Sequence, residues 1–188
     1  VTSFRNSRNI FKRVGGVHLV CGSDDFWLSM LAMTIIDLKN LPAHVDKSRR
    51  LMGIDHSKTR LGLAVSNPEL TLATPLAVLT RGKLQEDIAR LRALADEYAV
   101  GGFVVGLPLN MDDTEGPRAQ SVRHFADNLV KEFSLPLAFF DERLSTAHVK
   151  DILDAQNVPH HKRAGLVDKL AAQVILQDAL DFLARRGA

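Results

Sequence analysis

The succession of short apolar runs and amphipathic stretches that starts at Leu51 constrains the fold most strongly. Three apolar runs come first, LMGID, RLGLAVS and LTLATPLAVLT, and the segments between them, HSKT and NPE, have the composition of turns. Short apolar runs joined by tight turns pair most economically with their neighbours along the chain. This part of the sequence therefore predicts a meander of three antiparallel strands.

Helical and strand patterns alternate after the meander. KLQEDIARLRALADEYAV carries an apolar stripe at helical spacing, and GGFVVGLP has the composition of a buried strand. Pro117 suits the first turn of a second helix that runs to about Glu132, and LPLAFFDE predicts a fifth strand. We expect a short helix in STAHVKDILDA, a basic loop in PHHKRAG and a long final helix in LVDKLAAQVILQDALDFLARR. The order predicts an α/β fold with a mixed five-stranded sheet, three antiparallel strands first and parallel strands after them, flanked by helices.

Composition limits the class of protein. With 188 residues, 46% of them hydrophobic, the chain can build one globular domain with a substantial core, which excludes a disordered tail or a disulfide-stapled miniprotein. The single cysteine, Cys21, suits a reducing, cytoplasmic compartment. The formal net charge of +2 is too small to indicate nucleic-acid binding. It is the sum of a charge of +4 over residues 1–50 and a charge of −2 over residues 51–188.

The first 32 residues differ from the rest of the chain. They show no sustained helical or strand period, and their basic start is followed by an apolar run that Gly22 and Asp24 interrupt, which argues against a signal peptide. No stretch has the roughly 18 consecutive apolar residues of a membrane span. We expect residues 1–32 to be a basic extension, either disordered or an over-long reading of the gene before Met33, and residues 33–188 to form a single domain with its core in 51–185.

Acidic residues end two of the predicted strands. Asp55 follows LMGI, where burial disfavours an uncompensated carboxylate, although Asp also commonly begins a turn. Asp141 and Glu142 follow LPLAFF at the carboxyl end of a strand, which is where open α/β sheets place ligands. Successive strand residues point to opposite faces, so at most one of this pair can share a centre with Asp55, and both could instead form an acidic strand end in solvent.

Asp168 lies in the middle of the apolar stripe of the final helix. At about 100° per residue it shares a face with a run of apolar side chains, namely Ala171, Ala172, Ile175, Leu176, Ala179, Phe182 and Leu183. An acid in the first helical turn also favours the helix dipole, but that does not require the buried face. Three carboxylates without cysteine or spaced histidine ligands predict an all-oxygen site for Mg²⁺ or Mn²⁺, which suits two-metal phosphodiester hydrolysis.

Four segments together resemble one family: GIDHSKTRLGLAVS (53–66), GLPLNMDDTEGPRAQ (106–120), DERLST (141–146) and VDKLAAQVILQDALD (167–181). They are similar to the YqgF family, the RuvX-like Holliday-junction resolvases that are also described as pre-16S rRNA nucleases. The resemblance covers about residues 51–188 and implies an RNase H-like fold, with Asp55, Glu142 and Asp168 as catalytic, metal-binding acids. It also implies a cytoplasmic endonuclease that trims the 5′ end of precursor 16S rRNA in ribosome biogenesis.

The first motif departs from the family pattern, which commonly has D-x-G-T-K-R. Here Ser57 stands in place of the glycine, and Lys58 and Thr59 are in exchanged order. If the turn needs a positive φ, Ser57 would strain it by about 1 kcal/mol. Asp113 also stands where a glycine is common, at a loop position.

Basic side chains must bring nucleic acid to an acidic site in a region of net negative charge. The candidate nucleic-acid-binding residues are Lys58, Arg60, Asn110, Arg143, Lys162 and Arg163, with Arg118 and Arg123 on the second predicted helix as further cations. Each one could equally belong to the solvated surface, and Asn110 could orient substrate or cap a turn.

The sequence leaves other functions open. The leading hypothesis is a Mg²⁺-dependent endonuclease with precursor 16S rRNA preferred over branched DNA, with ribosomal particles as candidate partners and with a monomer or weak dimer as the active form. The alternatives are a DNA resolvase and a non-catalytic RNA- or ribosome-binding factor. Sugar kinases and actin-like ATPases share an Asp-containing hairpin, but they need two such domains to enclose ATP.

Overall fold

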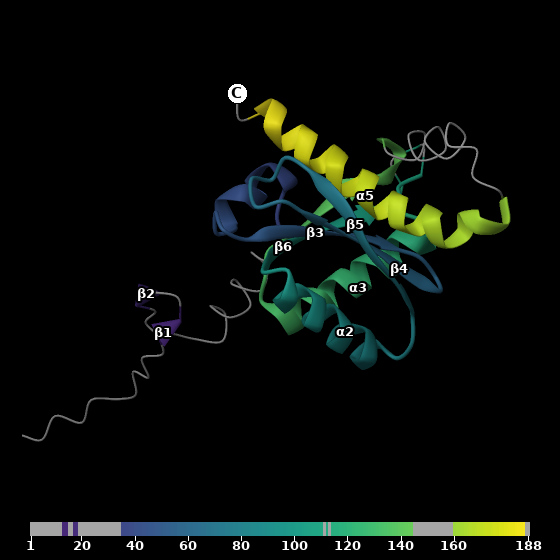
Figure 1. Ribbon diagram of the computed structural model, residues 1–188, viewed down its shortest axis with the longest axis horizontal. Helices are drawn as coiled ribbons and strands as arrows, with labels where there is room; N and C mark the ends of the chain where they lie inside the picture. The colour runs from purple at the N-terminus through teal and green to yellow at the C-terminus, as the bar shows by residue number, and fades with distance from the viewer. Residues whose placement is uncertain are drawn as a thin grey trace, which may run out of the picture.

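Five strands form one mixed sheet in the computed structural model (Figure 1). The structure describes the backbone of residues 13–14, 17–18, 35–110, 112, 114–144 and 160–186, and the side chains of residues 35–110, 112, 114–143 and 170–185. The strands are β3 (Arg50–His56), β4 (Arg60–Ser66), β5 (Ala73–Thr80), β6 (Val100–Leu107) and β7 (Leu137–Asp141). Their order is β5-β4-β3-β6-β7, with β3, β4 and β5 antiparallel and β6 and β7 added in parallel. The predicted mixed sheet is confirmed.

Helices cover both faces of this sheet (Figure 1). Helices α2 (Leu84–Glu97) and α3 (Pro117–Phe133) pack on one face against Met52, Ile54 and Phe103, and α5 (His160–Arg186) packs on the other against Leu51 and Val104. The residues of β3 alternate between the two cores, as the two-residue period of a strand requires. Strand β6 is buried along its whole length because helices cover it on both sides.

The segment before β3 also joins the fold, although the sequence assigned it no element. Ile35 forms a parallel bridge with Leu137, and the 3-10 helix η1 (Leu38–His44) buries Leu38 and Leu41. Near the amino terminus, β1 (Arg13–Val14) and β2 (Val17–His18) pair antiparallel. Most of residues 1–32 lie outside the described residues, so their interpretation as an extension stays a prediction.

Two predicted boundaries are wrong. Helix α5 begins at His160, within the segment that the sequence assigned to a basic loop. A single glycine, Gly165, costs about 1 kcal/mol inside a helix and does not end it, and no other residue from 160 to 166 disfavours helix. Strand β5 begins at Ala73, later than its apolar run, because the Asn67 side chain accepts hydrogen bonds from the backbone N–H of Thr71 and Leu72 and holds them in the loop. The predicted helix STAHVKDILDA lies outside the described residues.

Helix α5 lies directly against the backbone of the central strand. A Cβ atom on Gly53 would come within 2.7 Å of the Leu176 Cβ and 3.0 Å of the Ala172 carbonyl oxygen. Two glutamines outside the apolar stripe tie the helix to the sheet edge, since Gln177 accepts a hydrogen bond from the Ala73 N–H at 2.8 Å and Gln173 donates one to the Ala73 carbonyl at 3.0 Å. The helix is therefore fixed over the face of β3 that carries Asp55.

The described part of the chain contains no helix that is both long and apolar enough to cross a membrane.

The close contact at Gly53 gives a test of this packing. We expect Gly53→Ala to lower the free energy of unfolding by about 1–3 kcal/mol, because the added methyl group has to displace a helix backbone that is fixed elsewhere. Urea denaturation measures the change. Gly116→Ala is the matched control, since its Cβ would meet only the Asn110 side chain at 3.6 Å. Equal losses in the two variants would contradict the packing argument.

Candidate active site

Asp55 and Glu142 meet at the carboxyl ends of the parallel strands. Asp55 lies two residues after Gly53 on β3, so its side chain faces the same side of the sheet as α5. Glu142 begins the short 3-10 helix η2 (Glu142–Leu144) directly after β7. A Cβ atom on Gly106 of the intervening strand β6 would lie 2.5 Å from Glu142 Oε1. The carboxylate therefore occupies the space that the missing side chain of Gly106 leaves.

The electrostatics of Glu142 reflect this position. Burial, and after it the negative charge of Asp55, together raise the pKa of Glu142 from 4.5 to about 7. The Arg118 guanidinium opposes this rise. Two carboxylates are thus held within electrostatic reach of each other in a partly desolvated place, where their repulsion is only weakly screened.

Asp141 has a different partner. Arg143 Nε lies 3.1 Å and 3.0 Å from the two Asp141 carboxylate oxygens, Arg143 Nη2 lies 2.6 Å from Oδ2, and this guanidinium holds the pKa of Asp141 below its usual range. Arg143 also donates a hydrogen bond from Nη1 to the Asn110 carbonyl at 3.1 Å. Of the two neighbouring acids, Glu142 is therefore the one close to Asp55. Asp141 instead holds Arg143, which donates a hydrogen bond to the loop after β6.

The structure describes only the backbone of the third predicted acid. Asp168 lies in α5 four residues before Ala172, which is fully buried against the sheet, but its side chain lies outside the described residues. The same holds for Lys162 and Arg163. Among the described side chains, no group of three or more His, Cys, Asp or Glu could hold a metal ion. The role of Asp168 in the site therefore stays a prediction.

The turn at Ser57 does not have the positive φ that would strain a serine. The described residues with positive φ other than glycine are Leu70, Ala99 and Ser134, so Ser57 has an ordinary backbone conformation. Its hydroxyl accepts a hydrogen bond from the Arg60 N–H at 3.0 Å and donates one to the Arg60 carbonyl at 2.9 Å. The serine side chain itself closes the hairpin turn, which is a common use of Ser in turns.

The other predicted nucleic-acid contacts lie around this turn and the loop after β6. Lys58 is exposed at the tip of the hairpin, and Arg60 is half-buried at the start of β4. Asn110 closes its loop, since its backbone N–H donates to the Thr114 carbonyl at 3.0 Å and its side-chain Nδ2 donates to the Thr114 hydroxyl at 2.9 Å. Of the two interpretations of Asn110, this geometry favours the turn.

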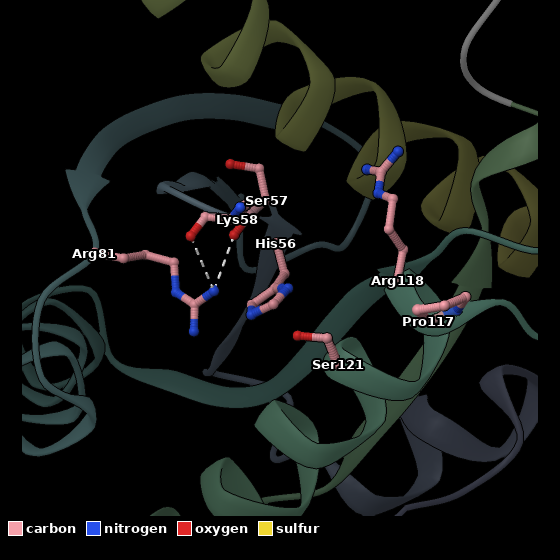
Figure 2. A pocket seen from close by; sticks show the side chains of 7 residues that line it. All are labelled: His56, Ser57, Lys58, Arg81, Pro117, Arg118 and Ser121. Atoms are coloured by element: carbon pink, nitrogen blue, oxygen red, sulfur yellow. Dashed lines mark hydrogen bonds between the residues drawn. The ribbon is translucent and has the colours of Figure 1, made fainter.

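A cavity on the other side of β3 contains residues that sequence reasoning did not combine. It has a volume of about 320 Å³, and we call it the basic cavity (Figure 2). Its lining residues are His56, Ser57, Lys58, Arg81, Pro117, Arg118 and Ser121. They come from the β3–β4 hairpin, the residue after β5 and the first turns of α3, which explains why no local motif indicated the cavity.

His56 forms the inner wall of the basic cavity. It is 4% exposed, and its ring packs against Phe125 of α3 with a centroid distance of 4.7 Å. Burial, and after it the positive charges of Arg81 and Arg118, together lower the pKa of His56 to about 4. The imidazole is therefore neutral at pH 7. The one signal in the sequence that His56 faces α3 was its place directly after Asp55, because successive side chains of a strand point to opposite faces.

The sequence model of the family described as "RuvX: Holliday junction resolvase" matches residues 49–182. The chain belongs to the RuvX family. Its relatives include proteins named "Putative pre-16S rRNA nuclease" from Methylocella silvestris, 45% identical over 82% of this chain and 96% of the relative, and from Bradyrhizobium diazoefficiens, 47% identical over 80% and 93%. Among solved structures, Thermus thermophilus RuvC in complex with Holliday junction substrate is similar with a TM-score of 0.48 and 18% identity, covering 74% of this chain and 97% of that one.

The hairpin of this RuvX-family protein gives one prediction. We expect Ser57→Ala to lower the free energy of unfolding by about 1 kcal/mol, because the half-buried Arg60 N–H and carbonyl lose their side-chain partner. Thermal and urea unfolding measure the loss. Thr71→Ala, at an exposed position in the next loop, removes a hydroxyl that accepts one hydrogen bond from Asn67 and is the matched control. A Ser57→Ala variant as stable as the wild type would contradict the role of the hydroxyl in the turn.

Glu142 gives a second prediction, on the pH dependence of stability without metal. Because its pKa rises from 4.5 in the unfolded chain to about 7 in the folded protein, folding favours the protonated form. This contribution to stability is complete below about pH 4.5 and is lost as the pH rises through about 7. Urea unfolding in EDTA should show this fall in the wild type and not in Glu142→Gln. An identical pH dependence in both proteins would refute the assignment.

Proposed function

We propose that this protein is a metal-dependent endonuclease that hydrolyses phosphodiester bonds in structured nucleic acid, with precursor 16S rRNA as its substrate. One observation carries the proposal: Asp55 and Glu142 are held together over Gly106 although burial and repulsion disfavour the charged pair. A divalent cation between such carboxylates relieves both penalties. The names of the relatives, which are 44–47% identical, support rRNA as the substrate.

The residues present fit a hard divalent cation. Asp55 and Glu142 offer carboxylate oxygens, and the space over Gly106 brings the Glu142 oxygen close to the sheet backbone. We infer that Asp168 adds the third carboxylate from α5, since its position continues the buried stripe of Ala172 and Leu176. Bound Mg²⁺ or Mn²⁺ would activate a water molecule and stabilise the leaving oxygen of the phosphodiester.

The chain itself contributes position and charge to the reaction. Asp55 is on a central strand paired on both sides, so its carboxylate is presented from a rigid element. Glu142 is kept in place by the neighbouring Asp141–Arg143 ion pair and by the hydrogen bond from Arg143 to the Asn110 carbonyl. Without a cation, Glu142 holds a proton up to about pH 7, so protons and metal ions compete for the same carboxylate.

A second candidate function is cleavage of branched DNA. The description of the matching family model, a Holliday junction resolvase, favours it. The same acids would serve both reactions, because two-metal hydrolysis acts on the phosphodiester and not on the base. A non-catalytic RNA-binding role is disfavoured. Although the first motif departs from the family pattern, the Ser57 hydroxyl still closes the hairpin beside Asp55. We place the protein in the cytoplasm, acting on precursor 16S rRNA or on ribosomal particles, as a monomer or weak dimer.

The proposal predicts the behaviour of acid variants. Asp55→Asn and Glu142→Gln should each lower the rate of cleavage of a precursor 16S rRNA fragment in Mn²⁺ or Mg²⁺ by at least about 100-fold, because a neutral amide binds the cation far more weakly. Both variants should also lose the rise in melting temperature that the metal gives to the wild type. Gel assays and thermal unfolding measure the two effects.

The control and the alternative substrate belong to the same experiment. Asp127→Asn removes an exposed carboxylate from α3 and should cleave at the wild-type rate. A four-way DNA junction in parallel reactions separates the two candidate substrates. Full activity in either acid variant would refute the metal role, and cleavage of the junction alone would favour the resolvase.

A further inference from the structure

The basic cavity has the charge of an anion site. Lys58, Arg81 and Arg118 contribute three cations, and no carboxylate is among the described residues that line it. Arg81 is fixed in orientation, because its Nη1 donates hydrogen bonds to the carbonyl oxygens of Ser57 and Lys58 at 3.1 Å and 3.4 Å (Figure 2). Its Nε atom is buried and has no hydrogen-bond partner in the structure. The cavity therefore presents positive charge, and one of the arginines that line it keeps a donor that the protein itself does not use.

The amino terminus of α3 forms a second side of the cavity. The helix is 17 residues long, and its N-cap is Gly116, which provides no side-chain cap for the first N–H groups. Pro117 and Arg118 of the first turn line the cavity, together with Ser121 one turn later. Uncapped N–H groups and the helix dipole favour an anion at this place.

His56 provides an independent indication of a ligand. The residue is 4% exposed, and its Nε2 atom is buried with no hydrogen-bond partner in the structure. A buried polar atom without a partner is energetically costly, so such atoms usually face a ligand or an ordered water molecule. The ring lines the cavity among the cations (Figure 2). In the tautomer that carries the proton on Nε2, it would donate a hydrogen bond to an anion.

We propose that the basic cavity binds a backbone phosphate of the nucleic-acid substrate, next to the phosphodiester that the acids cleave. This inference rests on the proposed function and names how the substrate is held. Asp55 and His56 are neighbours on β3 and face opposite sides of the sheet. Arg118 lines the basic cavity and also acts electrostatically on Glu142, so its charge reaches both sites. A strand that passes the end of β3 could present one phosphate to each.

The test uses charge variants of exposed cavity residues in the full-length protein. Arg118→Gln and Lys58→Gln remove one cation each, and Ser121→Asp introduces a carboxylate in the place of the anion. Lys131→Gln removes one positive charge from the exposed far end of α3 and is the matched control. The probes are inorganic phosphate, followed by thermal unfolding against chloride at equal ionic strength, and a labelled RNA hairpin, followed by fluorescence anisotropy. Both are measured in EDTA.

We expect phosphate to raise the melting temperature of the wild type and of Lys131→Gln, and to have no effect on Ser121→Asp. Arg118→Gln and Lys58→Gln should each weaken binding of the hairpin about fivefold and reduce the slope of log K against log salt by roughly one. Hairpin binding that is unchanged in all three cavity variants would overturn the proposal. A phosphate response that is lost while hairpin binding is unchanged would also overturn it, because the cavity would then serve free phosphate or a nucleotide.

Failure of the proposed function can be recognised separately. Both binding measurements exclude metal, so they give the same answer whether or not the protein cleaves RNA. If the wild type binds the hairpin through the cavity and does not cleave in Mn²⁺, the nuclease proposal fails and the phosphate site stands. If the wild type cleaves, Lys58→Gln should raise KM for the RNA fragment and leave kcat within about twofold, whereas Asp55→Asn should lower kcat.

Discussion

The contact between α5 and the glycines of the sheet underlies the arrangement of the whole candidate site. At Gly53 the helix approaches the backbone of β3, and at Gly106 both Ile175 and the Glu142 carboxylate occupy the space above β6. Any larger side chain at these two positions would separate the helix from the strands. The acids from β3 and from the end of β7 are close together because the sheet has no side chains where they meet. Packing and chemistry therefore depend on the same two residues.

The order of helices and strands could be predicted from the sequence because the spacing of apolar residues along the chain shows which side chains are buried. Strand β6 is apolar throughout and buried on both faces, and α3 begins at the proline that indicated its first turn. The boundaries that were wrong depend on local competition: Gly165 does not end α5, and Asn67 delays β5 through its side-chain hydrogen bonds. Both effects are local, but they depend on a side-chain hydrogen bond and on the tolerance of a helix for one glycine, and apolar periodicity reports neither.

The candidate site could be predicted from the sequence only in part. Alternation along a strand required that only one of Asp141 and Glu142 share a centre with Asp55, but the residues alone could not decide which. The choice of Glu142 came from the family resemblance. In the structure Asp141 pairs with Arg143, which distinguishes it from its neighbour. The basic cavity escaped prediction because its cations are far apart in sequence and each resembles an ordinary surface charge. Whether the turn at Ser57 needs a glycine could not be decided from the sequence, and in the structure the serine hydroxyl closes the turn with two hydrogen bonds.

Because Asp55 and His56 are adjacent on β3, residues cannot be inserted into this strand or deleted from it without changing both sites. Neighbouring residues at the end of β3 serve opposite faces, with an acid on one and a neutral ring among cations on the other. A one-residue slip in the pairing of β3 with β4 would exchange them, placing the imidazole beside Glu142 and the carboxylate beside Arg81. An insertion or deletion within the strand would thus invert both environments at once, whereas added residues at the exposed tip by Lys58 would leave them in register.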